Sequence, residues 1–144
     1  MTICRECGGI DCEARFHECL ALEFADPEYG VVHHLTVATY MLQHSARLSL
    51  EGWLFERQLL EDFILNGADP AQIRRAHRAD VDNARRKFKF RSINGRPLFD
   101  NFAWPMTILD VRKEPPRAYR EDITAWARKT LLASQDVLLE KHES

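Results

Sequence analysis

Apolar side chains recur through most of the chain at intervals of three and four residues, the spacing that places them on one face of a helix. In residues 11–24 this face carries Phe16, Cys19, Leu20 and Phe24. Helices are expected over residues 11–24, 28–44, 49–65, 69–87 and 117–141, with a shorter one over 106–111. The pattern therefore predicts an all-α fold, a small bundle of four or five main helices with an N-terminal loop that resembles a zinc knuckle.

Capping residues and prolines mark where these helices begin. Asp11 is expected to cap the first helix, Asp26-Pro27 to end it and start the second, and Ser49 to cap the third. Asp69-Pro70 is a start signal of the same kind, and Thr107-Ile108-Leu109-Asp110 fits a capping box. The capping signals and the apolar periodicity thus predict similar boundaries.

Two stretches fit the helical pattern less well. Residues 28–44 contain several β-branched side chains, Val31 and Val32 among them, which favour a strand. Their length and the spread of their apolar positions favour a buried helix instead. Residues 88–105 are irregular, and Asn94-Gly95 is a turn signal around which a short hairpin can form.

The length of 144 residues predicts a single helical domain, 1–144, in which residues 1–12 form a metal-binding loop packed on the first helical hairpin. Hydrophobic residues make up 45% of the chain and charged residues 29%, as in soluble globular proteins. No apolar run approaches the roughly 18 residues that a membrane span needs. The first residues also lack the basic start and apolar stretch of a secretory signal. We therefore expect a cytoplasmic protein with no membrane partner.

All four cysteines and four of the six histidines lie within the first 44 residues, which indicates a metal site. Cys4 and Cys7 are separated by two residues and followed by Gly8-Gly9, so a tight turn can place both sulfurs on one side. Cys12 is the natural third ligand. Cysteine and histidine ligands in a reducing compartment favour a structural zinc ion. A redox CxxC is the alternative, but such motifs usually follow a strand, and none is predicted before Cys4.

The fourth ligand can be inferred from the packing of the first two helices. A short break joins them, so they should lie antiparallel, which brings His44, at the end of the second helix, near Cys12. His34 is the alternative ligand, favoured if the second helix is broken or begins late. His33 lies about 16 Å from His44 along a helix, too far for the two to share an ion. Cys19 lies on an apolar stripe and is expected in the core.

Two further patterns allow other functions. Glu23, His34 and Tyr40 can line a cavity for acid–base chemistry, which supports the alternative of a metal-dependent enzyme. Residues 74–96 form a basic tract of nine lysines and arginines with two interleaved phenylalanines, so nucleic-acid binding is another alternative. The net charge of −8 over residues 1–70 weakens it, because a basic tract that faces the acidic half of the same chain is the simpler interpretation.

The N-terminal motifs resemble those of a bacterial family of domains of unknown function. Its members open with CxxCG, carry a further cysteine before a helix of the type FHxxLALE, and continue with HHLTVxxYxxQH. The corresponding residues here are Cys4–Gly8, Cys12, Phe16-His17 with Leu20–Glu23, and His33–His44. The resemblance implies no activity, but it supports five positions as site residues: Cys4, Cys7, Cys12, His34 and His44.

These observations together predict a structural zinc-binding helical domain that acts as a binding or regulatory module. Its partner is expected to be a protein rather than a nucleic acid. Within the sequence there is no Gly-rich phosphate loop, GxSxG motif or HExxH motif that would name a reaction.

Overall fold

A computed structural model of the chain describes residues 3–67, 95–99 and 102–143. Within these residues the fold is all-α, as predicted, and Ile3 and Ile10 form an isolated antiparallel bridge. Two 3₁₀ helices, η1 (Ser45–Arg47) and η2 (Ile108–Asp110), accompany the α-helices. The α-helices are α1 (Cys12–Ala25), α2 (Pro27–Gly30), α3 (His33–Gln43), α4 (Leu50–Ile64) and α6 (Pro116–Glu143).

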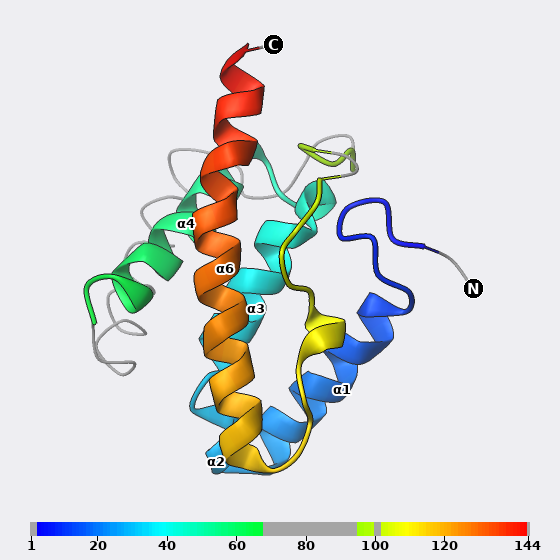
Figure 1. The fold of residues 1–144 in the computed structure, drawn as a ribbon, viewed down its shortest axis with the longest axis vertical. Helices are drawn as coiled ribbons and strands as arrows, with labels where there is room; N and C mark the ends of the chain where they lie inside the picture. Colours follow the sequence, from blue (N-terminus) through cyan, green and yellow to red (C-terminus); the bar gives the residue numbers. More distant parts are fainter. Residues whose placement is uncertain (1–2, 68–94, 100–101, 144) are drawn as a thin grey trace.

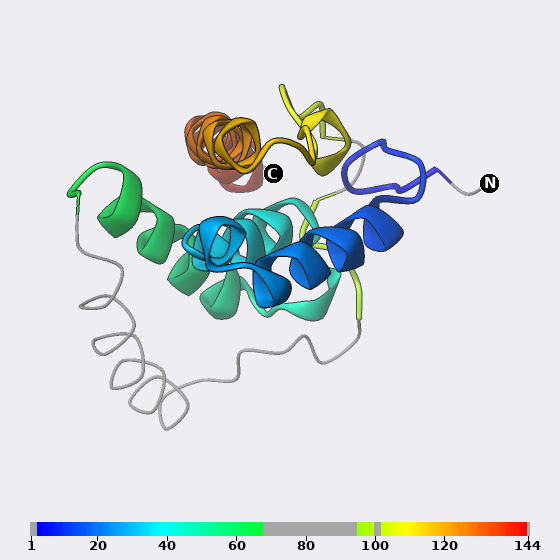
Figure 2. The ribbon, with the colours of Figure 1, turned by 90° about the horizontal axis from the view of Figure 1, so that it is seen from below.

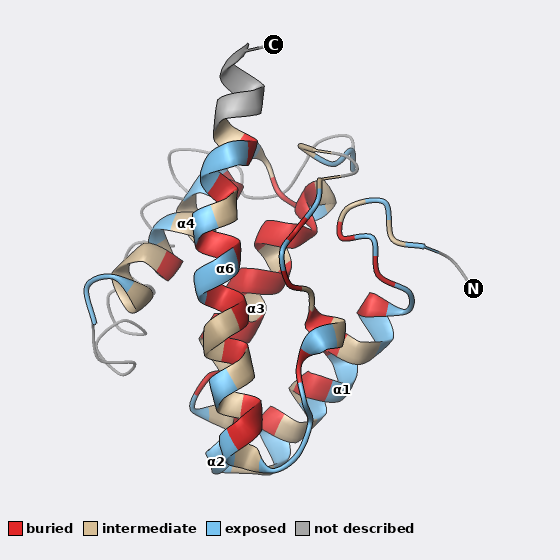
Figure 3. Cartoon of the chain, in the orientation of Figure 1, coloured by how far each residue is buried: buried red, intermediate tan, exposed pale blue. Residues whose placement is uncertain are grey.

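The helices are arranged in two layers. Seen along α6, helices α1, α3 and α4 lie in one layer, and α6 lies in the other with the segment that carries η2 (Figure 2). Helix α3 runs through the centre, between α1 and α4 and behind α6 (Figure 1). Buried residues recur along both α3 and α6 (Figure 3), and Leu42 of α3 and Trp126 of α6 belong to one hydrophobic cluster that joins the two layers. Burial of these apolar faces is the main source of stability in a bundle of this kind.

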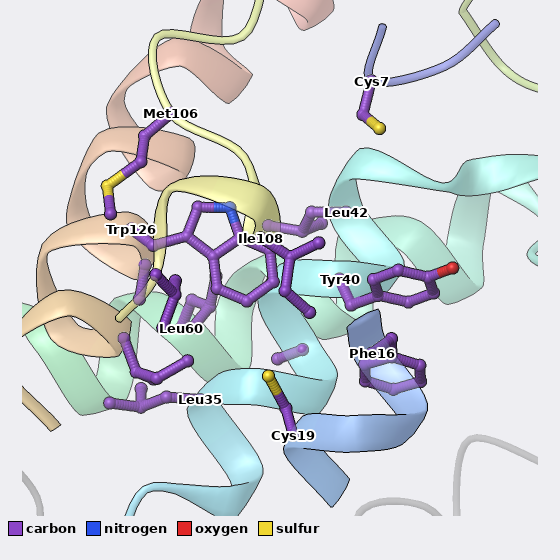
Figure 4. Close-up of a cluster of buried hydrophobic side chains, with 14 of the residues drawn as sticks. Cys7, Phe16, Cys19, Leu35, Tyr40, Leu42, Leu60, Met106, Ile108 and Trp126 are labelled. Atoms are coloured by element: carbon purple, nitrogen blue, oxygen red, sulfur yellow. The ribbon is translucent and has the colours of Figure 1, made fainter. Parts of the chain in front are cut away.

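The core is built from large side chains of both layers. Trp53 of α4, Leu42 of α3, Ile108 of η2 and Trp126 of α6 are each at most 1% exposed. Figure 4 shows the indole ring of Trp126 beside Ile108, with Leu42 above Tyr40 in the view. Because η2 supplies a fully buried residue, the segment before α6 is part of the core rather than a surface connection.

Most of the helix starts that the sequence predicts are confirmed. Asp26 Oδ1 accepts the backbone N–H of Glu28 at 2.9 Å with Pro27 at the first helical position, and Ser49 Oγ accepts the N–H of Gly52 at 3.0 Å. Thr107 and Asp110 form the expected capping box. Asp11 is an exception: it has a φ of 57° and its side chain makes no capping bond. In that left-handed conformation Asp11 reverses the chain between the N-terminal loop and α1.

The single helix expected over residues 28–44 is divided. Helix α2 ends at Gly30, and α3 begins at His33. Tyr29 holds α2 in place, since its hydroxyl donates to the carbonyl of Lys113 at 2.8 Å and its ring packs on Tyr119. The chain turns at Val31 and Val32, whose β-branched side chains favour a helix less than straight-chain residues do. The turn sets where α3 begins and therefore which way its histidines point.

The remaining expectations differ in outcome. The helix expected over 117–141 is confirmed by α6, and the short helix over 106–111 is present as η2. The helix expected over 69–87 lies outside the described residues, and so does half of the irregular region 88–105. Among the helices that the structure describes, none combines the length and the apolar character that crossing a bilayer requires.

Candidate metal centre

The N-terminal loop, residues 3–10, folds back on itself. The N–H of Cys4 donates to the carbonyl of Gly9 and the N–H of Gly8 donates to the carbonyl of Cys4, both at 2.8 Å. Gly8 has a φ of 78°, a conformation that glycine adopts without strain. The N–H of Gly9 then points to Cys7 Sγ at 3.4 Å. A turn of this kind directs the sulfurs of Cys4 and Cys7 to the same side of the loop, as the CxxCGG pattern predicts.

Four residues from three parts of the chain meet at this loop. Cys4 and Cys7 lie on the loop, Cys12 is the first residue of α1, and His44 follows the last residue of α3. Their possible ligand atoms all lie within 4.8 Å of one another. Three sulfurs and one imidazole nitrogen at such distances can coordinate one metal ion. The geometric inference that antiparallel packing would bring His44 to Cys12 therefore agrees with the structure.

The ring of His44 is oriented for coordination. Its Nδ1 lies 2.8 Å from the carbonyl oxygen of Tyr40, which can only accept, so Nδ1 carries the proton and Nε2 keeps a free lone pair. Nε2 is buried and has no hydrogen-bond partner. Burial also lowers the pKa of His44, which favours the neutral imidazole that binds metals. An unpartnered buried nitrogen next to three thiols is the arrangement that a metal ion would complete.

Burial shapes the chemistry of the thiols as well. It raises the pKa of Cys7, and the neighbouring Cys12 and Cys4 raise it further, while the N–H of Gly9 opposes the shift. The pKa of Cys12 is raised in the same way, mainly by burial. Three thiolates so close together would repel one another in a buried site unless a cation balanced their charge. The donor set therefore fits a divalent ion that prefers sulfur and nitrogen ligands.

Aromatic rings form one wall of the centre. The ring of Tyr40 lies between those of Phe16 and His44, with centroid distances of 3.8 Å and 3.9 Å. Figure 4 shows Phe16 and Tyr40 face to face, with Cys7 on the loop beyond them. The Tyr40 hydroxyl interacts with Cys12, and burial raises the pKa of Tyr40, so it stays protonated and can donate to the sulfur. The wall shields the ligands from water on the α1 and α3 side.

Glu6 fastens the loop to the rest of the molecule. Its Oε1 accepts the hydroxyl of Ser45 at 3.0 Å and the N–H of Ala46 at 3.1 Å. Its carbonyl accepts the indole N–H of Trp104 at 3.1 Å. No sequence pattern predicts these contacts, because the partners lie 39, 40 and 98 residues away along the chain. Only its position between Cys4 and Cys7 could have drawn attention to Glu6.

A family model for DUF5946, described as a family of unknown function, matches residues 2–135. The chain belongs to this family. No curated protein matches the chain, and no solved structure matches it either. The resemblance inferred from the N-terminal motifs is thus confirmed at the level of the family, and DUF5946 itself brings no activity to the residues described above.

The other candidate residues of this DUF5946 protein lie elsewhere. Cys19 is fully buried in the core, as predicted. His34, the alternative fourth ligand, packs its ring against Phe63 at a centroid distance of 4.0 Å and is not part of the metal-ligand cluster. His33 contacts Glu23 instead of the cysteines. Among the described histidines, His44 alone joins the cysteine cluster.

The expected cavity of Glu23, His34 and Tyr40 is not formed. Glu23 bonds to His33, Thr36 and Tyr119, whereas His34 packs on Phe63 and Tyr40 lies at the metal centre. The cavity prediction placed His34 beside Glu23, whereas the structure places His33 there. With α3 beginning at His33, it is His33 that lies beside α1. The basic tract 74–96 falls almost entirely outside the described residues, so nucleic-acid binding through it stays a prediction.

Proposed function

We propose that this protein is a structural zinc-binding helical domain. Cys4, Cys7, Cys12 and His44 would hold one Zn²⁺ ion, which would fix the N-terminal loop to the start of α1 and the end of α3. The observation that carries the proposal is the convergence of four ligand atoms within 4.8 Å, one of them a buried nitrogen with no other partner. Zinc suits three sulfurs and one imidazole because it binds both kinds of ligand and accepts a tetrahedral arrangement without an electronic penalty.

The ligand set supports a structural rather than a catalytic ion. Structural zinc sites have four protein ligands, whereas catalytic sites keep one position for water or substrate. Here four protein side chains would fill all four positions of a tetrahedral site, and a wall of stacked rings lies beside them. We infer that the ion stabilises a surface that contacts a protein partner, so that the domain acts as a binding or regulatory module in the cytoplasm.

The proposal is tested by the metal content of freshly purified protein, measured by inductively coupled plasma mass spectrometry. We expect one zinc ion per chain, lost in Cys4→Ser and in His44→Ala, because three remaining ligands would hold the ion far more weakly. Cys19→Ala and His34→Ala are the matched controls, each removing a cysteine or histidine that lies outside the cluster. Parent protein free of metal, or variants that keep their zinc, would contradict the proposal.

A further inference from the structure

Glu23 is a buried carboxylate held by donors from two other helices. Its side chain is 0% exposed. Oε2 accepts the hydroxyl of Thr36 at 2.5 Å and the hydroxyl of Tyr119, and Oε1 lies 2.7 Å from His33 Nδ1. Three donors satisfy a buried charge that would otherwise be costly. Glu23 is thus held by three partners, and none of them belongs to the metal centre.

His33 connects this buried charge to the surface. Since the carboxylate can only accept, Nδ1 of His33 donates to it, and Nε2 keeps its lone pair. The side chain is 37% exposed, so the ring bridges the interior and the solvent. A carboxylate on one ring nitrogen fixes the tautomer and orientation of the imidazole and increases the basicity of the other nitrogen.

An exposed aromatic ring lies next to this imidazole. Phe24 is 76% exposed, and its ring centroid is 5.1 Å from that of His33. It belongs to the turn of α1 that also carries Glu23, so the same short segment supplies a buried charge and an exposed apolar surface. The two features together form a site with one proton acceptor and one apolar contact.

We propose that Glu23 and His33 form a second functional site, separate from the metal centre, that hydrolyses small esters whose apolar part lies against Phe24. His33 Nε2 takes a proton from a water molecule while the water oxygen attacks the ester carbonyl carbon. The ester C–O bond then breaks, and the leaving alcohol oxygen takes the proton back from the imidazolium. Glu23 stabilises the imidazolium through its contact with Nδ1, and the products are the acid and the alcohol, with no further reactant.

His17 provides a matched control within the same molecule. It also lies near a carboxylate, Glu13, but at 3.7 Å, and both side chains are exposed, at 66% and 64%. His17 is therefore an exposed imidazole on α1, the helix that also carries Glu23, but it is not part of the Glu23–His33 pair, which we call the dyad. An activity that depends on the buried carboxylate should be lost when His33 is replaced and kept when His17 is replaced.

The experiment follows hydrolysis of p-nitrophenyl acetate by the parent protein, His33→Gln and His17→Gln. We expect the second-order rate constant to fall about 100-fold in His33→Gln, the low end of general-base effects, and to stay unchanged in His17→Gln. Circular dichroism verifies that both variants keep their helices. An unchanged rate in His33→Gln, or equal losses in the two variants, would overturn the proposal.

A second measurement needs no variant. Diethyl pyrocarbonate acylates unprotonated imidazole, and mass spectrometry of the briefly treated parent protein gives the rate at each histidine. His33 should react faster than His17 although it is less exposed, because its Nε2 is activated through Glu23. Faster modification of His17 would show that exposure alone sets the reactivity and that the dyad has no special chemistry.

Discussion

Glu56 of α4 has a half-buried carboxyl group, and burial raises its pKa to about 7. Because this pKa lies above the value in the unfolded chain, the folded protein holds the proton more tightly. The free energy of unfolding should therefore fall as the pH rises from about 4.5 towards 7. Above that range the Glu56 carboxylate is ionised in both states, and its destabilising effect on the fold no longer changes with pH. Glu56→Gln removes it and should stabilise the protein at pH 8 by on the order of 2 kcal/mol.

Urea unfolding of both proteins at pH 5 and pH 8 measures this effect. The difference between Glu56→Gln and the parent should be large at pH 8 and small at pH 5. Glu51→Gln, a change at an exposed carboxyl group of the same helix, is the control and should show no such dependence. A Glu56→Gln difference of the same size at both pH values would contradict the assignment.

At the scale of elements, helix α2 packs closely against α1 at Gly30. A Cβ atom on Gly30 would lie 2.6 Å from the carbonyl oxygen of Glu23, which belongs to the backbone and cannot move aside easily. Gly30→Ala should therefore lower the free energy of unfolding by about 1–3 kcal/mol, the usual cost of overpacking. Glu28→Ala, at an exposed position of the same short helix, should change it little. Chemical denaturation measures both, and equal effects would show that α2 is not closely packed at Gly30.

The same element shows what a pattern of residues can and cannot predict. Periodicity and caps gave the positions of α1, α4 and α6, because those signals are local. The turn at Val31 depends instead on contacts of Tyr29 with residues 84 and 90 positions further along the chain. Without that turn, the starting point of α3 is unknown, and the choice between His33 and His34 as the partner of Glu23 has no basis in sequence.

At the scale of the whole molecule, the metal centre lies at one edge of the fold and the largest core residues lie elsewhere. Trp53 of α4 and Trp126 of α6 are both buried in the core, and no described ligand residue belongs to either helix. Removing the metal with a chelator should release the N-terminal loop but leave these helices formed. It should also lower the free energy of unfolding by about 3 kcal/mol, the linkage value for metal at hundredfold excess over its dissociation constant.

Hydrogen exchange before and after chelation measures this prediction. The amides of Cys4 and Gly8, which bond within the loop, should exchange faster without metal, and those of α6 should stay protected. Loss of helical circular dichroism on chelation would show instead that the ion is required for the whole fold.

The cluster itself was predictable because cysteine spacing is local, whereas its attachment through Glu6 and Trp104 was not, because it depends on tertiary contacts.

Helix α3 begins with His33 and ends immediately before His44. The same helix therefore positions a histidine of the Glu23 site at one end and a histidine of the metal centre at the other. Eleven residues of helical rise place the backbones of His33 and His44 about 16 Å apart along the axis, and an α-helix keeps this spacing because its hydrogen bonds fix the rise. Each site is completed by residues of other elements, Glu23 and Tyr119 at one end and the cysteines at the other. Substitutions at the two ends should therefore combine additively, and one site can be lost or altered in the course of evolution while the other persists.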